Sequence, residues 1–243
     1  MASRRYKVKK SAQIAEKEEV KDFIERPEVL VEQLSKTEAF FQKHKNLALG
    51  IMGAIIVVVG GFLGYRYYLS SQNDIAQREM FQAVFYFEQD SLTQALNGDG
   101  INFGLLDIIS DYGSTSAGNL AKFYAGASYL KLGEYDNAID QLSGFSSSDL
   151  LVQARAYSLV GDAYMELGNY SDAAKNYDRA ADYKPNKTIT SDYLMKAALA
   201  YEKQSDYASA IDRYQEIISD HFGSAQYQNA KKYKARLEAL ASP

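Results

Sequence analysis

Apolar residues are grouped along this chain in two ways, one continuous and one periodic. From Leu47 to Tyr65 nineteen residues run without a charge, so this stretch has no polar stripe. Beyond residue 118 the apolar positions recur three or four residues apart, which predicts amphipathic helices. Only three prolines and as many as twenty tyrosines favour a helical, aromatic-packed interior. We therefore predict an all-α fold, in which one membrane-type helix precedes a solenoid of paired helices.

The uncharged stretch has the length of a membrane-spanning helix. At 1.5 Å per residue it would extend roughly 28 Å, about one hydrocarbon core. Lys45 precedes it, Arg66 follows it, and Tyr67 and Tyr68 stand where an interfacial aromatic belt would lie. A buried soluble helix would be shorter or carry a polar stripe, and a signal peptide would begin near residue 10 and end in a cleavage site of small residues. We predict an uncleaved transmembrane helix over residues 47–69.

Positive charge is concentrated before this helix. Residues 1–46 have a net charge of +3 and residues 47–243 one of −7. The positive-inside rule predicts a cytoplasmic N-terminus and a C-terminal domain across the inner membrane, periplasmic in a Gram-negative bacterium. The acidic balance of that domain argues against binding to nucleic acid. The flanking cations are Arg26, Lys36, Lys43 and Lys45 before the stretch, and Arg66 and Arg78 after it.

Residues 1–46 are predicted to form a basic, amphipathic cytoplasmic segment. A helix is expected from Glu28 to Asn46, and it would lie on the inner leaflet, grip a cytosolic partner or only lead into the membrane helix. Its apolar face would hold Leu30, Leu34, Thr37 and Phe41.

The predicted membrane helix contains several glycines. Gly60 and Gly64 form a G-x-x-x-G pair, which would let two such helices pack closely and form a homo-oligomer. Glycine is also common in membrane helices for other reasons, so both interpretations stand.

Residues 70–118 are predicted to form leading helices. The first would run over 70–96 with an aromatic face that includes Phe81 and Phe85, and the second over 103–111. The stretch 97–100, Asn-Gly-Asp-Gly, is interpreted as a turn. No Lys-Ser/Thr follows it as in a phosphate loop, and no glutamate closes a calcium loop.

Three stretches of the outer domain repeat one residue pattern. Their first residues, Gly126, Gly161 and Ala198, are 35 and 37 positions apart. Each is followed by Tyr three positions later, Gly or Ser at seven, Tyr at nine and Ala at twelve. The matching residues are Tyr129, Gly133, Tyr135 and Ala138; Tyr164, Gly168, Tyr170 and Ala173; and Tyr201, Ser205, Tyr207 and Ala210.

This pattern resembles the tetratricopeptide repeat, a helix-turn-helix of about 34 residues. Small residues at the first and fifth marks would let two antiparallel helices approach closely, and the Gly or Ser between them would make the turn. These residues are expected to be core rather than site. The resemblance implies units over 119–153, 154–190 and 191–222, with a polar-backed capping helix over 223–243.

Residue types that carry catalysis are scarce. His44 flanks the membrane helix and His221 ends a repeat helix, so no histidine pair is available for a metal. The absence of cysteine excludes disulfides and thiolate sites. No G-x-S-x-G, phosphate loop or dinucleotide fingerprint occurs. We expect neither enzyme activity nor a cofactor or metal.

The resemblance to tetratricopeptide repeats implies a protein-binding groove lined by the first helix of each pair. Domains of this kind that clamp a chaperone's C-terminal carboxylate need Lys and Asn at positions that Phe123 and Ala127 occupy, so an extended or helical peptide is the expected ligand. The groove positions are Leu120, Phe123, Ala127, Leu130 and Lys131 in the first unit, Arg155, Ser158, Asp162, Met165 and Glu166 in the second, and Asp192, Lys196, Leu199, Glu202 and Lys203 in the third.

The whole plan is similar to the YfgM-type ancillary subunit of the SecYEG translocon. The most telling run is Tyr-Gly-Ser-Thr-Ser-Ala-Gly-Asn-Leu-Ala at residues 112–121, which leads into the first repeat. The resemblance implies an inner-membrane adaptor whose periplasmic repeats bind translocon partners, chaperones and exported client proteins. A general envelope scaffold for cell division or cell-wall assembly is the alternative, because repeat domains serve many functions.

Overall fold

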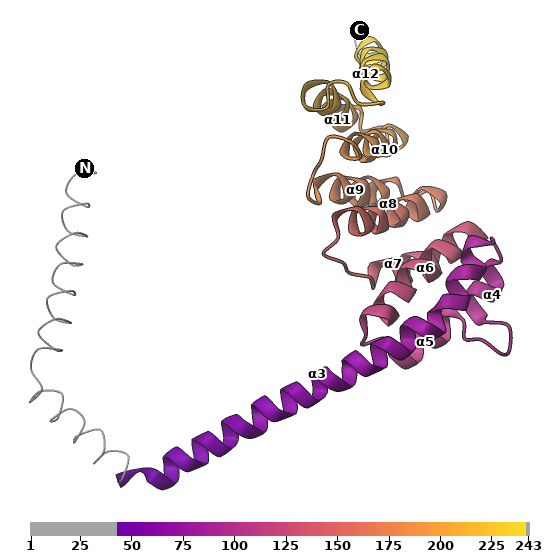
Figure 1. Ribbon diagram of the computed structural model, residues 1–243. Helices are drawn as coiled ribbons and strands as arrows, with labels where there is room; N and C mark the ends of the chain where they lie inside the picture. The colour runs from indigo at the N-terminus through magenta and orange to yellow at the C-terminus, as the bar shows by residue number, and fades with distance from the viewer. Residues whose placement is uncertain (1–42, 242–243) are drawn as a thin grey trace, which may run out of the picture. The chain divides into compact units, whose positions relative to one another are not determined.

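The computed structural model describes residues 43–241, and every regular element among them is a helix. This confirms the all-α fold class. The chain divides into two compact units between Arg66 and Tyr67, and α3 (Lys45–Glu88) contributes to both (Figure 1). The other helices, all in the second unit, are α4 (Leu92–Asn97), α5 (Leu105–Tyr112), α6 (Ser116–Leu132), α7 (Tyr135–Ser143), α8 (Leu150–Glu166), α9 (Tyr170–Asp182), α10 (Thr190–Lys203), α11 (Tyr207–Asp220) and α12 (Tyr227–Ala241).

Among the described residues α3 is the one helix whose length and composition would allow it to cross a membrane. No residue in its most apolar 18-residue window is buried within the chain. A Cβ added at Gly60 or Gly64 would meet nothing within 4 Å, so the predicted packing through these glycines stays a prediction. The predicted cytoplasmic segment lies outside the described residues, apart from its last four.

The leading helices differ from the prediction at two places. No helix end separates residues 47–69 from those that follow, because α3 continues without a break to Glu88. The predicted helix over 70–96 is instead interrupted at residues 89–91, where Asp90 adopts a φ of 59°. This left-handed conformation cannot continue an α-helix, and aspartate tolerates it better than most residues. The interruption lets α4 turn back and bury Leu96 in a cluster with α5 and α6.

The turn predicted at residues 97–100 is confirmed, and Asp99 organises it. Its Oδ1 accepts the backbone N–H groups of Ile101 and Asn102 at 2.8 and 2.6 Å, and the Tyr86 hydroxyl donates to Oδ2 at 2.7 Å. These hydrogen bonds, led by the one from the Asn102 backbone, hold the pKa of Asp99 well below its ordinary value. The loop is thereby tied to α3.

Close helix contact explains the small residues of the repeats. A Cβ on Gly126 would lie 2.5 Å from the Leu142 side chain, and one on Gly161 would lie 2.6 Å from the Tyr177 ring. On the second helix of each pair the alanine of the repeat pattern is fully buried: Ala138, Ala173 and Ala210. The pairs α6–α7, α8–α9 and α10–α11 are therefore held at a separation that larger side chains would prevent.

The turns inside the pairs all use the left-handed conformation. Gly133, Gly168 and Ser205 have φ values of 80°, 72° and 67°. The third unit thus keeps the backbone geometry although serine replaces glycine, and it bears the steric cost that a Cβ adds there. After the third pair, α12 buries Ala230 and Leu237 in one core cluster with residues of α10 and α11, at the place where a capping helix was predicted. Figure 1 shows α6 to α12 following one another along the solenoid.

Candidate protein-binding groove

An apolar cavity of about 400 Å³ lies across the first helices of the repeats. α6 contributes Leu120, Phe123 and Tyr124, and α8 contributes Leu151, Val152 and Arg155. Ile189 and Tyr193 close it from the start of α10. Three predicted groove residues, Leu120, Phe123 and Arg155, are brought together here.

Capping and loop contacts hold the start of α8 beside α6. The Asp149 carboxylate accepts the backbone N–H groups of Leu151 and Val152 at 2.8 and 3.0 Å, which fixes the first turn of α8. Asn119 of α6 exchanges two hydrogen bonds with the backbone of Ser146, in the loop that leads to α8. The cavity therefore has walls that are ordered before any ligand arrives.

Aromatic side chains support the inner wall. The Phe123 ring packs 5.4 Å from Phe145 and 5.8 Å from Tyr124, measured between ring centroids, and Tyr124 packs 5.2 Å from Phe87. Phe123 is half-buried in this arrangement, so one of its faces belongs to the core and the other to the cavity. Such a wall loses little side-chain freedom when it binds a ligand.

Arg155 brings charge to the otherwise apolar lining. Its guanidinium is exposed, and no carboxylate within residues 43–241 lies at ion-pair distance from it. Burial raises the pKa of the neighbouring Tyr193 phenol, and the positive charge of Arg155 partly opposes this effect. Arg155 therefore presents a solvent-exposed positive charge at the cavity that no carboxylate of residues 43–241 pairs with.

A second cavity of about 570 Å³ shares Leu120 and Val152 with the apolar one. Its other walls are mainly polar and come from residues 113–119 and the loop 145–148. Together the two cavities offer an apolar surface beside hydroxyl and backbone groups, which is suited to a polypeptide.

Other predicted groove residues bind one another instead. The Lys196 Nζ lies 2.7 Å from Asp162 Oδ1 and 3.3 Å from the Ser158 hydroxyl, and the Tyr177 hydroxyl donates to the same Asp162 oxygen at 2.7 Å. Ser158 is fully buried. Burial and the charge of Asp162 raise the pKa of Tyr177 well above its ordinary value. This acid, tyrosine and base form a cross-link between α8, α9 and α10.

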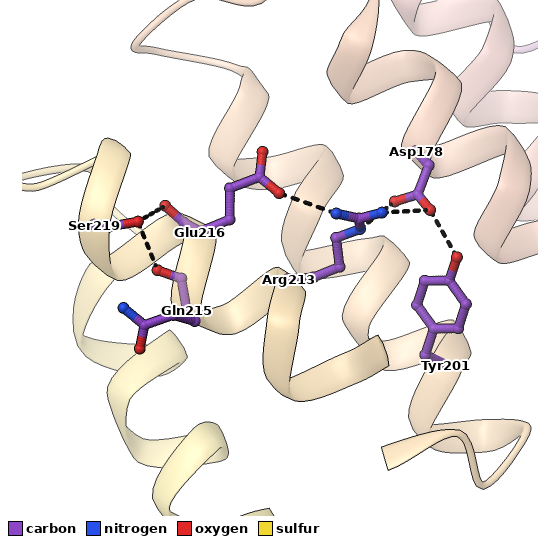
Figure 2. Close-up of polar contacts among 6 residues, drawn as sticks. All are labelled: Asp178, Tyr201, Arg213, Gln215, Glu216 and Ser219. Carbon is purple, nitrogen blue, oxygen red and sulfur yellow. Dashed lines mark hydrogen bonds and ion pairs between the residues drawn. The ribbon is translucent and has the colours of Figure 1, made fainter. Parts of the chain in front are cut away.

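The same combination recurs one helix further along (Figure 2). Arg213 Nε lies 2.8 Å from Asp178 Oδ1, and the Tyr201 hydroxyl donates to Asp178 Oδ2 at 2.7 Å. Arg213 Nη1, at the other side of the guanidinium, lies 3.1 Å from Glu216 Oε2. Burial, followed by the hydrogen bond to Asp178, raises the pKa of Tyr201 to about 12.

A third such cluster involves the predicted groove residue Glu202. The Tyr214 hydroxyl donates to Glu202 Oε1 at 2.6 Å, while Arg236 of α12 pairs with Oε2. Tyr214 is fully buried, and this burial, followed by the hydrogen bond, raises the pKa of its phenol. The third repeat is joined to the capping helix in this way.

The remaining predicted groove residues lie outside the apolar cavity. Lys131 pairs with Asp90 at 2.7 Å, Asp192 accepts a hydrogen bond from Gln226 at 3.0 Å, and Met165 packs against the core cluster that contains Tyr177. Ala127 is buried, Leu130 packs against the core cluster of the first pair, and Glu166, Leu199 and Lys203 are exposed.

Sequence reasoning missed Tyr124, Leu151, Val152, Ile189 and Tyr193 as cavity residues. One signal was available, because residues 150–152 are three consecutive apolar side chains at the start of a helix. A single amphipathic face cannot bury three neighbours together, so at least one had to remain at the surface. Leu151 is 55% exposed.

Sequence comparison agrees with this geometry. Residues 123–188 and 159–220 match the family pattern of the tetratricopeptide repeat. The helical pairs of this region are tetratricopeptide repeats. Proteins with these repeats bind other proteins, and the apolar cavity lies on the first helices of the pairs, where the groove of a tetratricopeptide array was expected.

Over about half of its length the chain is similar to parts of much longer proteins. Superkiller complex protein 3 of Mus musculus is 26% identical over 114 residues, which cover 47% of this chain and 7% of that protein. Tetratricopeptide repeat protein 37 of Xenopus laevis is 23% identical over 127 residues, which cover 52% of this chain and 8% of that protein. Superkiller complex protein 3 of Homo sapiens is 25% identical over 114 residues, which cover 47% of this chain and 7% of that protein. The chain thus matches less than a tenth of the length of each of these relatives.

Proposed function

We propose that this protein is a membrane-anchored, non-enzymatic adaptor whose tetratricopeptide repeats bind partner proteins at the Sec translocon and assist exported clients. The observation that carries the binding role is the preformed apolar cavity across α6, α8 and α10. An apolar concave surface with ordered walls is typical of peptide recognition. The proposed location is the inner membrane, with a cytoplasmic N-terminus and periplasmic repeats.

The translocon assignment is supported by where the resembling run of residues 112–121 lies. It contains the end of α5, the capping residue Thr115 and the first turns of α6, including Leu120 of the cavity wall. Gly118 is required there, because an added Cβ would lie 2.1 Å from the Tyr112 carbonyl oxygen. The run that is similar to the YfgM-type subunits thus builds one end of the groove.

Site-specific photo-cross-linking in native membranes tests the proposal. A photoreactive amino acid at Leu151 would report the groove, since this side chain is exposed on its rim. Leu167 is the matched control, because it is also exposed and follows the other end of the same helix, roughly 24 Å away. Adducts with Sec channel subunits, periplasmic chaperones or nascent exported chains at 151 and not at 167 are expected.

Two other outcomes would change the assignment. Adducts confined to cell-division or wall-synthesis proteins would replace the translocon role by that of an envelope scaffold. Adducts between two copies of the chain would favour a homo-oligomeric structural protein. In that case replacement of Gly60 and Gly64 by isoleucine, followed by membrane cross-linking, would test whether the membrane helix holds the copies together.

A further inference from the structure

Leu151, at the rim of the apolar cavity, and the cation Arg155 lie on one face of α8. Leu151 and Arg155 are four residues apart, which places their Cβ atoms about 5–6 Å from each other on the same side of the helix. Leu151 is 55% exposed, although it belongs to the cavity lining. An apolar surface and a positive charge are therefore offered at a short, defined separation.

Arg155, at the apolar cavity, differs from three cations that cross-link neighbouring helices of the repeats. Lys196, Arg213 and Arg236 each pair with an acid from an earlier helix, and each of these acids also accepts a tyrosine hydroxyl. No such acid faces Arg155 within the described part of the chain. Its charge acts on the phenol of Tyr193, whose pKa it lowers against the effect of burial. A carboxylate from outside would meet an uncompensated guanidinium.

We propose that the groove binds an extended partner segment in which a large apolar side chain stands two residues from a single carboxylate. The apolar side chain enters the cavity between Phe123, Val152 and Leu151, and the carboxylate pairs with Arg155. Side chains two residues apart in an extended chain project from the same face and lie about 6.6 Å from each other, close to the 5–6 Å between the two α8 positions. This inference rests on the proposed protein-binding function and adds the chemistry of the partner.

One carboxylate, rather than an acidic run, fits the charge of the domain. Residues 47–243 carry a net charge of −7, and the exposed Asp149 and Asp192 stand at the starts of the two helices that meet at the cavity. Additional acids in the partner would face these groups and be repelled. The surface thus favours a mostly apolar or neutral segment with one negative charge.

Selection from a random peptide library tests this preference. The full chain, reconstituted in lipid nanodiscs, would be panned against mRNA-displayed random dodecapeptides, with empty nanodiscs for subtraction. We expect the bound peptides to be enriched in Leu, Ile, Phe or Met, with Asp or Glu favoured about two- to fivefold over Asn or Gln at two positions from that residue.

Matched variants identify the groups responsible. Arg155→Gln should abolish the preference for acid while the apolar enrichment persists, and Leu151→Glu should reduce the apolar enrichment. Lys175→Gln removes the same charge from α9, outside the cavity lining, and should leave both preferences unchanged. An acid preference that is absent in the unmodified protein, or that survives Arg155→Gln, would overturn the inference.

The failure of this inference is distinguishable from that of the proposed function. Peptides selected without an acid preference, together with Sec adducts at residue 151, would leave the adaptor role and remove the recognition rule. No enrichment over empty nanodiscs also overturns the rule, whereas the photo-cross-linking result continues to decide the adaptor role independently. Adducts at 151 that join only two copies of this chain would overturn both.

Discussion

Lys196 of α10 reaches back to Asp162 of α8, with 2.7 Å between Nζ and Oδ1 and 34 residues between them in the sequence. Arg213 with Asp178 and Arg236 with Glu202 repeat the arrangement at separations of 35 and 34 residues. In all three pairs the acid comes first and the cation lies one repeat length later. The interior of the solenoid is therefore cross-linked between neighbouring repeats by ion pairs as well as by apolar contacts.

Breaking the Asp162–Lys196 pair should weaken the contact between two repeats. Both side chains are about one-third exposed or less, at 27% and 35%, so the coupling should exceed that of a fully solvated pair. A double-mutant cycle with Asp162→Asn and Lys196→Gln is expected to give about 1 kcal/mol. Urea unfolding of the full chain in detergent, followed by circular dichroism at 222 nm, measures it.

A control for this cycle is the exposed pair of Lys175 and Asp172 within α9. Lys175→Gln should leave the unfolding midpoint nearly unchanged. If Lys196→Gln has no larger effect than Lys175→Gln, the inter-repeat pair does not stabilise the array.

Gly161→Ala should destabilise the second helical pair. The new Cβ would lie 2.6 Å from the Tyr177 ring, which is buried and tied to Asp162 by its hydroxyl, so the ring has little freedom to move. Overpacking of this kind costs about 1–3 kcal/mol and outweighs the gain of about 1 kcal/mol in helix propensity. Gly126→Ala is the comparison, since the clash there is with the more flexible Leu142 side chain. A stabilised Gly161→Ala protein would show that the helices separate easily.

Ser205→Gly should stabilise the third pair by about 0.5–1 kcal/mol. Ser205 has a φ of 67°, and relief of the left-handed strain exceeds the entropy that glycine adds to the unfolded chain. The reciprocal change, Gly168→Ser, should cost a similar amount, because its φ is 72° and no other group lies within 4 Å of the added Cβ. Thermal unfolding of both variants checks the opposite signs, and shifts in the same direction would contradict the explanation.

Alkaline pH should destabilise the repeats through the buried tyrosines. The pKa of Tyr201 is raised from 10 to about 12, so the unfolded chain loses this proton first. The contribution is fully present below pH 10 and is lost as the pH rises towards 12. Tyr201→Phe should therefore cost about 1 kcal/mol at pH 7 and flatten the decline of stability between pH 10 and 12.

A suitable control is Tyr207→Phe, because Tyr207 is 45% exposed at the start of α11. Its pH profile should follow that of the unmodified protein. Unfolding midpoints measured by circular dichroism from pH 8 to 12 would reveal an equal flattening in both variants if ionisation of Tyr201 is not responsible.

The sequence alone determined the repeats, because their physics is local and periodic. The close helix approach at Gly126 and Gly161, the turns at Gly133, Gly168 and Ser205, and the all-α class follow from which residues recur at a fixed spacing. Steric limits on a Cβ act at single positions, so a one-dimensional pattern can reveal them. The membrane span over 47–69 and its orientation remain predictions from the same kind of pattern.

Only the tertiary structure decided which groove positions are available to a ligand. Asp162, Lys196 and Glu202 occupy groove positions by their spacing, yet partners in neighbouring helices satisfy them, while Arg155 has no ion pair among residues 43–241. Ile189 and Tyr193 reach the cavity from a third helix, and the break at Asp90 redirects α4. The ion pairs and the walls of the cavity form where side chains from different repeats meet, and the paired side chains are 34 residues apart in the sequence. The residue spacing within one repeat does not specify these contacts.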